Sequence, residues 1–202
     1  MTNSALRGVF VLFVMLLAAC TSSGPKTAYY SLFPESNIVV NSDTSLNGSG
    51  LTFGVGPIVL PEYVDHPGIV SVNNSNRVTV SGYNAWAGDL QENISRVLAS
   101  NLSARWDVDQ VWAFPWDNRV RPFYQVRLVF EDFSGVRGGE VNIVARWTLL
   151  NAKGNTSLAV GVERIKTETT SAKYNDYVAA LNTAVNELSQ RIAEKVAKEV
   201  SP

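Results

Sequence analysis

Residues 124–150 read YQVRLVFEDFSGVRGGEVNIVARWTLL, and apolar side chains alternate with polar ones in both halves of this segment. The alternating apolar positions are Tyr124, Val126, Leu128 and Phe130, and then Val141, Ile143, Ala145, Trp147 and Leu149. A period of two is typical of a β-strand with one buried face. The Gly-rich residues 134–139 between the halves favour a hairpin turn. The segment therefore predicts two antiparallel strands that cover a core with their apolar faces.

A third strand is predicted after a second tight connection, which completes a three-stranded meander. Its apolar face begins with Leu158, Val160 and Val162. The alternation then changes phase near Glu163. Upstream, residues 51–60 (LTFGVGPIVL) predict another buried strand, in which Gly54 and Gly56 mark a bulge and Pro57 marks an edge.

Two segments carry apolar residues at spacings of three and four, which is the period of an amphipathic helix. They are residues 84–106, with Asn84 as the predicted N-cap, and residues 174–200. Each helix needs a surface to cover, and the predicted meander supplies one. We therefore predict an α+β fold: a two-layer domain with a mainly antiparallel β-sheet packed against two amphipathic helices. This single domain is expected to span residues 51–202.

The first twenty residues resemble the signal of a bacterial lipoprotein. Arg7 precedes an eleven-residue apolar stretch at residues 9–19. A membrane-spanning helix needs about 20 residues, so this length fits a signal peptide instead. The stretch ends in Leu17-Ala18-Ala19-Cys20, which is similar to a lipobox. The prediction is a signal peptide at residues 1–19 and lipidation of Cys20, the only cysteine of the chain.

A tether and a loop follow the lipidated cysteine at residues 20–50. Residue 21 is Thr and not Asp, which by resemblance to the enterobacterial sorting rule favours the periplasmic face of the outer membrane. A short strand is predicted at residues 29–33. Residues 34–50 are rich in Ser, Asn and Gly, so they predict turns and a mobile loop that contributes nothing to the core.

The composition excludes several classes of function. The chain has 17 Lys and Arg against 18 Asp and Glu, for a net charge of −1, whereas nucleic-acid binding needs clustered basic residues. One Cys and one His cannot form a His/Cys zinc site, which takes about four ligands. No phosphate-binding loop, dinucleotide fingerprint or calcium loop is present. We therefore predict no cofactor, no metal and no nucleic acid.

Catalytic candidates are few. His66 is the only imidazole, so a Ser-His-Asp arrangement would have to use it, yet no Gly-x-Ser-x-Gly motif accompanies it. Glu62 and Asp65 are a carboxylate pair in the same loop, and loop solubility explains them better than glycosidase chemistry. The sequence predicts no catalytic residue and no enzyme.

Aromatic residues are the remaining candidates for a functional site. Trp112, Phe114 and Trp116 gather in a predicted connection between strands, and Tyr63 lies outside the clear helix and strand patterns. One interpretation is a small satellite core beneath a long loop. The other is an exposed surface that binds a partner, because aromatic residues are enriched at such surfaces.

Taken in order, several motifs resemble the ABC-type transport auxiliary lipoprotein family, in particular its PqiC (YmbA-like) members. The motifs are Tyr29-Tyr30-x-Leu32, Val55-Gly56-Pro57-Ile58-x-Leu60-Pro61-x-Tyr63-x-Asp65-x-Pro67-x-Ile69-Val70, Trp86-Ala87-x-x-Leu90, Pro115-Trp116, Ala145-Arg146-Trp147 and residues 181–193. The sequence departs from the family at His66, where Arg is more usual, at Gly68, where Gln is, and at Gly88-Asp89, where Glu-Pro is expected.

The resemblance implies a non-enzymatic auxiliary role in lipid transport between the two membranes. It implies as partners an MCE-domain tunnel protein and its integral inner-membrane partner, with outer-membrane phospholipid holding the acyl anchor. The protein would dock on the tunnel or form a collar around it, and a ring-like homo-oligomer fits this arrangement. Two alternatives stay open: a periplasmic chaperone that carries an acyl chain between helices and sheet, and a hydrolase that uses His66.

Overall fold

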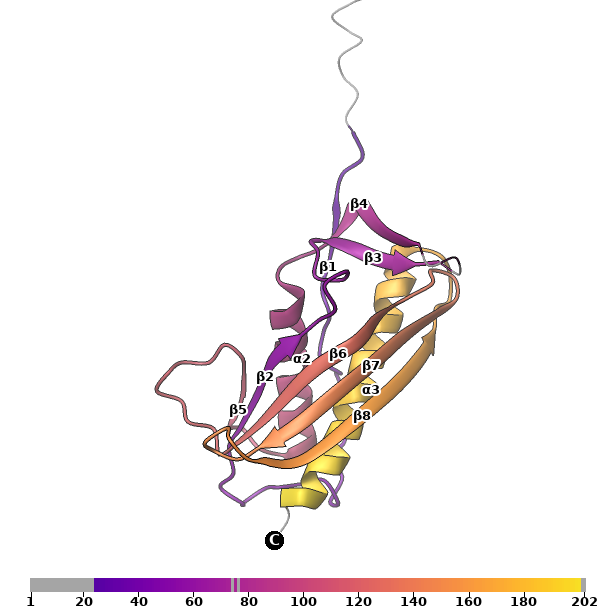
Figure 1. Cartoon of the computed structure of the whole chain (residues 1–202). Helices are drawn as coiled ribbons and strands as arrows, with labels where there is room; N and C mark the ends of the chain where they lie inside the picture. Colours follow the sequence, from indigo (N-terminus) through magenta and orange to yellow (C-terminus); the bar gives the residue numbers. More distant parts are fainter. Residues whose placement is uncertain (1–23, 74, 76, 201–202) are drawn as a thin grey trace, which may run out of the picture.

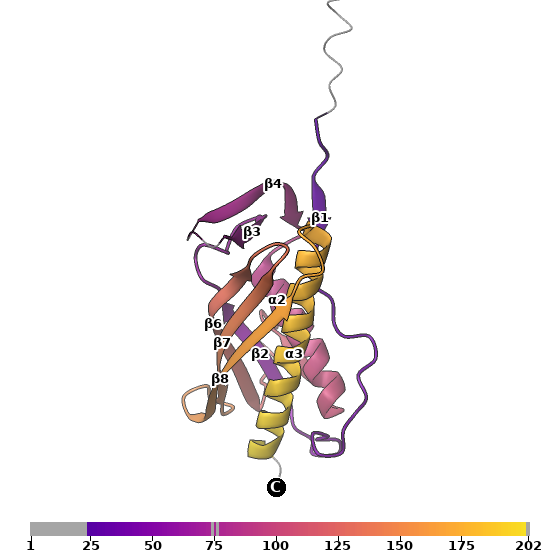
Figure 2. The ribbon, with the colours of Figure 1, turned by 90° about the vertical axis from the view of Figure 1, so that its right-hand side faces the viewer.

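A computed structural model describes residues 24–73, 75 and 77–200, so the predicted signal peptide at residues 1–19 and Cys20 lie outside the described residues. The domain has two layers (Figure 1). A five-stranded sheet forms one layer, and two helices cover one of its faces, as the view at right angles shows (Figure 2). A separate three-stranded sheet lies at the end of the molecule where the chain enters. The predicted two-layer α+β fold is confirmed.

The strands are β1 Ala28–Tyr30, β2 Phe53–Val59, β3 Gly68–Val72, β4 Val78–Trp86, β5 Val111–Ala113, β6 Tyr124–Gly135, β7 Glu140–Leu150 and β8 Ser157–Glu168, and the helices are α2 Leu90–Trp106 and α3 Tyr174–Val200. The large sheet has the order β5-β2-β6-β7-β8, and the small sheet has the order β1-β4-β3. The three long strands β6, β7 and β8 pair antiparallel. The short strand β5 and β2 pair parallel, as do β2 and β6 and, in the small sheet, β1 and β4.

The predicted hairpin of β6 and β7 is confirmed, with residues 136–139 as its connection. All the predicted inward positions of β7 are fully or almost fully buried, and so are Val126, Leu128 and Phe130 of β6. They form the core together with the apolar stripes of α2 and α3. Burying one such large side chain stabilises the fold by about 1.5–3 kcal/mol, so this shared face holds the two layers together.

The predicted inward face of β8 is wrong. Leu158 and Val160 are exposed on the outer face of the sheet, where Val160 keeps 68% of its surface accessible. The residues that face the helices are Ala159, Gly161, Glu163 and Ile165. No phase change occurs near Glu163, because the pairing with β7 is continuous there. The physical reason is the indole of Trp147, which lies over Gly161 so closely that a β-carbon would meet it.

Glu163 is the charged residue at this buried face, with 3% of its surface accessible. Its carboxylate accepts a hydrogen bond from Trp147 Nε1 at 3.0 Å. Lys195 Nζ of α3 pairs with the same oxygen at 2.5 Å. A buried carboxylate costs several kcal/mol unless it is paired and hydrogen-bonded, and here both conditions are met. The contacts of Glu163 with Trp147 and Lys195 therefore join β7, β8 and α3.

The bulge predicted in β2 is confirmed as a register shift between Val55 and Ile58 in the pairing with β6. The predicted edge position of Pro57 needs a correction, because β2 lies inside the sheet, between β5 and β6. β5 pairs with β2 only as far as Val55. Pro57 therefore lies beyond the end of the pairing with β5. No hydrogen bond to β5 requires an amide hydrogen at this position, and proline has none.

The predicted start of the first helix is wrong. Asn84 belongs to β4, and α2 begins at Leu90 with Asp89 as its N-cap, whose side chain accepts a hydrogen bond from the amide of Glu92. The error arises from Trp86, which is the last residue of β4. Trp86 lies four residues before Leu90, so it continues the helical spacing of the apolar residues although it belongs to a strand. The second helix is confirmed as α3, Tyr174–Val200.

Residues 33–50 form a strap along the helices, and its role differs from the prediction. Thr44 and Leu46 are buried, and the amide of Leu46 donates to Trp106 O at 2.7 Å. At the other end of the strap, the amide of Glu35 donates to Oδ1 of the fully buried Asn101. The Ser, Asn and Gly content of the strap predicted turns but not these contacts with the helices. The contacts depend on helix residues more than 50 positions away in the sequence.

We predict that Glu163→Ala lowers the free energy of unfolding by about 2–4 kcal/mol, because it leaves the Trp147 donor unpaired and removes packed atoms. Urea-induced unfolding of the purified domain measures this. The control is Glu140→Ala, which removes an exposed ion pair with Lys166 and should cost less than about 1 kcal/mol. Equal losses for both variants would contradict a special role for the buried carboxylate.

Candidate functional site

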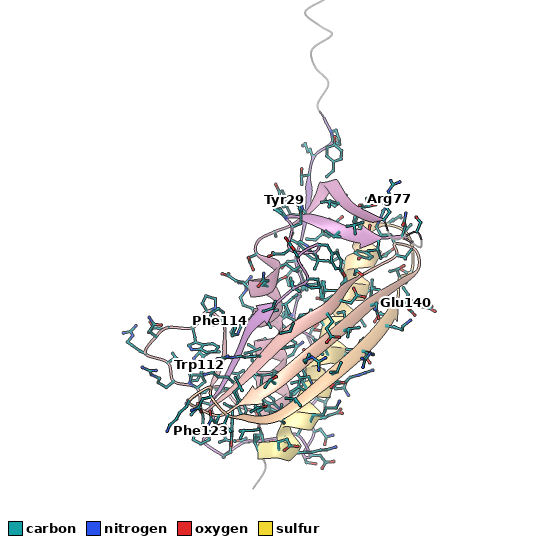
Figure 3. All side chains as sticks on the ribbon, in the orientation of Figure 1. Tyr29, Arg77, Trp112, Phe114, Phe123 and Glu140 are labelled. Atoms are coloured by element: carbon teal, nitrogen blue, oxygen red, sulfur yellow. The ribbon has the colours of Figure 1, made fainter. Side chains whose placement is uncertain are left out.

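The connection between β5 and β6 carries the most prominent exposed aromatic residues of the large sheet. Residues 114–123 leave the sheet edge as an open loop that projects beside β2 and β5 (Figure 1). Phe114 opens the loop and is 41% exposed, and Phe123 closes it and is 52% exposed. Figure 3 shows both side chains at this edge together with Trp112, which is half-buried in β5. We call residues 112–123 the aromatic loop.

The aromatic loop is packed against the sheet through Trp116. Its indole lies over Gly54 of β2, where a β-carbon would come within 2.8 Å of Trp116 Cη2 and Cζ3. The rings of Phe114 and Trp116 meet edge to face, with their centroids 5.4 Å apart. Pro122 is buried beside the same glycine. The two interpretations of these aromatic residues therefore both apply: Trp116 and Pro122 make a satellite core, which supports the exposed Phe114 and Phe123.

Helix α2 fixes the start of the loop. Ser95 of α2 is buried, and its hydroxyl donates to Val55 O at 2.7 Å. The amide of Phe114 donates to the same carbonyl at 2.9 Å and to Ser95 Oγ at 3.0 Å. These bonds fix the backbone of Phe114. A residue whose backbone is already fixed loses less conformational entropy when a partner binds, which favours affinity.

The loop also presents positive charge. Arg119 pairs with Asp117, which accepts from its Nε at 3.0 Å and from its backbone amide at 2.8 Å. These hydrogen bonds from Arg119 hold the pKa of the Asp117 carboxyl below its usual value. Arg121 is exposed on the same loop. Exposed phenylalanines next to arginines are a combination that protein interfaces favour.

Tyr63 belongs to a different place. It lies in the turn between β2 and β3, and its hydroxyl donates to Asp132 Oδ1 at 2.7 Å. Ser134 and Asn142 donate to the same carboxylate. Burial raises the pKa of the Tyr63 hydroxyl, and the neighbouring charge of Asp132 adds to this effect. Tyr63 is therefore part of a polar cluster that ties the turn to β6 and β7.

The structure does not bring Tyr63 to the aromatic loop. Phe114 bonds to Val55, which pairs with Val126 of β6. Asp132 is six residues farther along that strand, which corresponds to about 20 Å at the rise of a β-strand. The four predicted partner-binding residues thus fall into one group of three, Trp112, Phe114 and Trp116, and one distant residue. Sequence reasoning missed Phe123 and the two arginines, although the run RVRPF at residues 119–123 carries the signal.

The loop that holds His66 makes turn contacts. His66 is exposed, and its Nδ1 accepts a hydrogen bond from the amide of Gly68 at 2.9 Å. Asp65 accepts from Gln91 Nε2 at the start of α2, at 3.0 Å. Within the described part of the chain, His66 makes no hydrogen bond to a serine hydroxyl or a carboxylate. The geometry thus supplies this imidazole with neither a nucleophile nor an orienting acid.

Residues 24–73, 75 and 77–200 contain neither a metal-binding cluster nor a membrane-spanning helix. No group of three or more His, Cys, Asp and Glu side chains in this range is arranged to hold a metal ion. No helix in this range is both long and apolar enough to cross a membrane. Cys20, the predicted lipidation site, lies outside the range.

Solved structures share this fold. One, described only as an uncharacterized protein, is 18% identical, with 85% of this chain and 99% of that chain covered and a TM-score of 0.67. Protein XCC0632 from Xanthomonas campestris is 13% identical, with 86% and 96% covered and a TM-score of 0.71. At such identities the likeness concerns the fold alone. No curated protein matches the chain by sequence.

A sequence model for the ABC-type transport auxiliary lipoprotein component matches residues 30–193. The chain belongs to this family, so the resemblance predicted from the sequence motifs is confirmed. The aromatic loop lies inside the matched range.

We predict that Gly54→Ala displaces Trp116 and loosens the aromatic loop, because the added β-carbon overlaps the indole. Limited proteolysis should cut residues 117–121 at least several-fold faster in this variant. The matched control is Gly82→Ala in β4, where no heavy atom lies within 4 Å of the added carbon. Unchanged cleavage in Gly54→Ala would show that the loop is held in some other way.

Proposed function

We propose that this protein is an outer-membrane-anchored periplasmic lipoprotein and a non-enzymatic auxiliary component of an MCE-type intermembrane lipid transport system. It docks on the periplasm-spanning tunnel or forms a collar around it at the outer membrane. Membership of the transport auxiliary lipoprotein family is the observation that carries this proposal. The lipobox-like motif at the amino terminus and the exposed aromatic loop add support.

The anchor is assigned to Cys20. It follows a lipobox-like motif, and the first described residues, 24–27, are all exposed and lead away from β1 (Figure 1). Two acyl chains hold a protein stably on a bilayer, at about 0.8 kcal/mol per buried CH₂, so a fully acylated cysteine suffices. Thr21 supports sorting to the outer membrane.

The docking surface is assigned to the aromatic loop. Figure 1 places this loop on the flank of the domain beside β5, nearer the end opposite the departing tether. A protein hung from the outer membrane would thus offer Phe114 and Phe123 toward the periplasm, where a tunnel protein ends. The partners are the MCE-domain tunnel protein and, through it, the integral inner-membrane component. Several copies arranged as a ring could surround one tube, because cyclic symmetry closes such contacts.

The lipid-carrier alternative needs a cavity between the layers. One apolar space there is lined by Val64, Val70, Trp86, Leu90, Phe133 and Leu181, and its volume is about 10 Å³. That is room for about one water molecule and not for an acyl chain. The layers would have to separate before a chain could enter, so this alternative has no specific support.

We predict that a photo-crosslinker replacing Phe114 forms a covalent adduct with the MCE-domain protein in living cells. An aromatic side chain at the centre of a contact is within reach of the partner. The control carries the crosslinker at Val39, which is 88% exposed on the strap. Immunoblots and mass spectrometry identify the adducts. Absence of an envelope transport protein from the Phe114 adducts would refute the assigned surface.

We predict that Cys20→Ala abolishes acylation and releases the protein into the soluble periplasmic fraction. A second variant, Thr21→Asp, should stay acylated but move to the inner membrane, because the sorting signal changes. Membrane fractionation and the mass of the amino-terminal peptide measure both effects. A wild-type protein that lacks acyl chains at Cys20 would overturn the anchor assignment.

A further inference from the structure

The small sheet exposes apolar side chains at the end of the domain from which the tether departs. Tyr29 of β1 is 69% exposed and Tyr83 of β4 is 55% exposed. Val78 and Val80 of β4 are exposed as well. β4 lies at the upper end of the molecule in both ribbon views, next to the point where β1 leads into the tether (Figures 1 and 2). We call these four residues the apical patch.

The backbone beneath Tyr83 is firmly held. The pairing of β3 and β4 shifts register between Gly68 and Val70, so the stretch of β4 that contains Tyr83 forms a bulge. Ser81 Oγ accepts hydrogen bonds from the amide of Asn84 at 3.0 Å and from Asn84 Nδ2 at 2.9 Å. Tyr30 of β1 donates its hydroxyl to Asn84 Oδ1 at 3.1 Å. A bulge stabilised in this way aims its side chain in a set direction.

The length of the tether limits how far the patch can lie from a bilayer. From Cys20 to Ala28 the chain has eight residue steps, and an extended chain spans at most about 3.3–3.6 Å per residue. An acylated Cys20 at the bilayer surface would therefore keep the start of β1 within about 30 Å of it. β1 is itself the edge strand of the small sheet, so the sheet is the part of the domain bound most closely to the anchor.

We propose that the apical patch rests in the headgroup region of the phospholipid bilayer, so that the small sheet is a second membrane contact besides the lipid anchor. This inference rests on the proposed acylation of Cys20. Tyrosine suits this region because its ring is apolar and its hydroxyl remains hydrated. The valines add apolar area. Arg77, immediately before β4, and Lys26 on the tether are exposed cations for lipid phosphates. Figure 3 shows Tyr29 and Arg77 at this end.

This contact would set the orientation of the domain. An anchor on a free tether permits any tilt, whereas two contacts at the same end hold the long axis away from the membrane. Tyr177 of α3 then transmits this orientation, because its buried hydroxyl donates to Val70 O of the small sheet at 3.0 Å. The aromatic loop would point into the periplasm in every copy, which a collar requires.

Spin labels on the full, acylated protein in vesicles of phosphatidylethanolamine and phosphatidylglycerol test this inference. Acylation blocks the sulfur of the only natural cysteine, so one introduced cysteine is the sole labelling site. The variants are Tyr83→Cys and Val80→Cys, and the matched control is Val160→Cys on the outer face of the large sheet. Electron paramagnetic resonance measures how often each label meets oxygen, which concentrates in lipid, and a water-soluble nickel chelate.

We expect the ratio of oxygen to nickel accessibility to be several-fold higher at residues 80 and 83 than at residue 160. Equal ratios at all three positions, in protein that floats with the vesicles, would overturn the membrane contact and leave the anchor intact. Protein that does not float would overturn the anchor as well. Unlabelled Tyr83→Ser with Val80→Ser should still float, while a label at Tyr29→Cys in that background should lose most of its high ratio.

Discussion

The fold depends on how the buried Trp106 joins its neighbours. This residue ends α2, and its ring lies 4.4 Å from the ring of Phe53 in β2. Its Nε1 donates to Ala193 O of α3 at 3.1 Å, and its carbonyl accepts from Leu46 of the strap. This α2 side chain thus contacts β2 and α3, while its backbone holds the strap. Because a buried indole donor must be paired, the two helices can pack together in few ways.

Polar groups buried at other points of the same interface add specificity. Asn101 of α2 donates to Asn186 and Ser189 of α3, and it accepts from the strap. Tyr177 reaches the small sheet, and burial raises the pKa of its hydroxyl. Glu163 joins β8 to α3. Each of these groups would be costly to bury alone, so each favours the one arrangement that satisfies it. Together these buried contacts join α3 to α2, to the small sheet and to β8.

Much of the architecture could be predicted from local patterns, and the errors have identifiable causes. The β6–β7 hairpin and α3 follow directly from their periods of two and 3.6. β8 was assigned the wrong face, because Leu158 and Val160 look like core residues until Trp147 is seen to occupy the space over Gly161. The candidate site was found in part: aromatic density pointed to Trp112, Phe114 and Trp116. The bond that removes Tyr63 from this group joins it to Asp132, 69 positions away, and no local pattern reports such a pairing.

The amino-acid sequence by itself determined the family, the two-layer fold class and the predicted lipid attachment at Cys20, because each depends on the order and spacing of residues within short segments. Only the tertiary structure decided which aromatic residues pack against the sheet and which are exposed, both in the aromatic loop and on the small sheet. Exposure is a property of what packs against a residue, and those neighbours come from distant parts of the chain. Trp116 is half-buried because Gly54 leaves space for its indole, whereas Tyr83 lies in the irregular stretch of β4 and is 55% exposed.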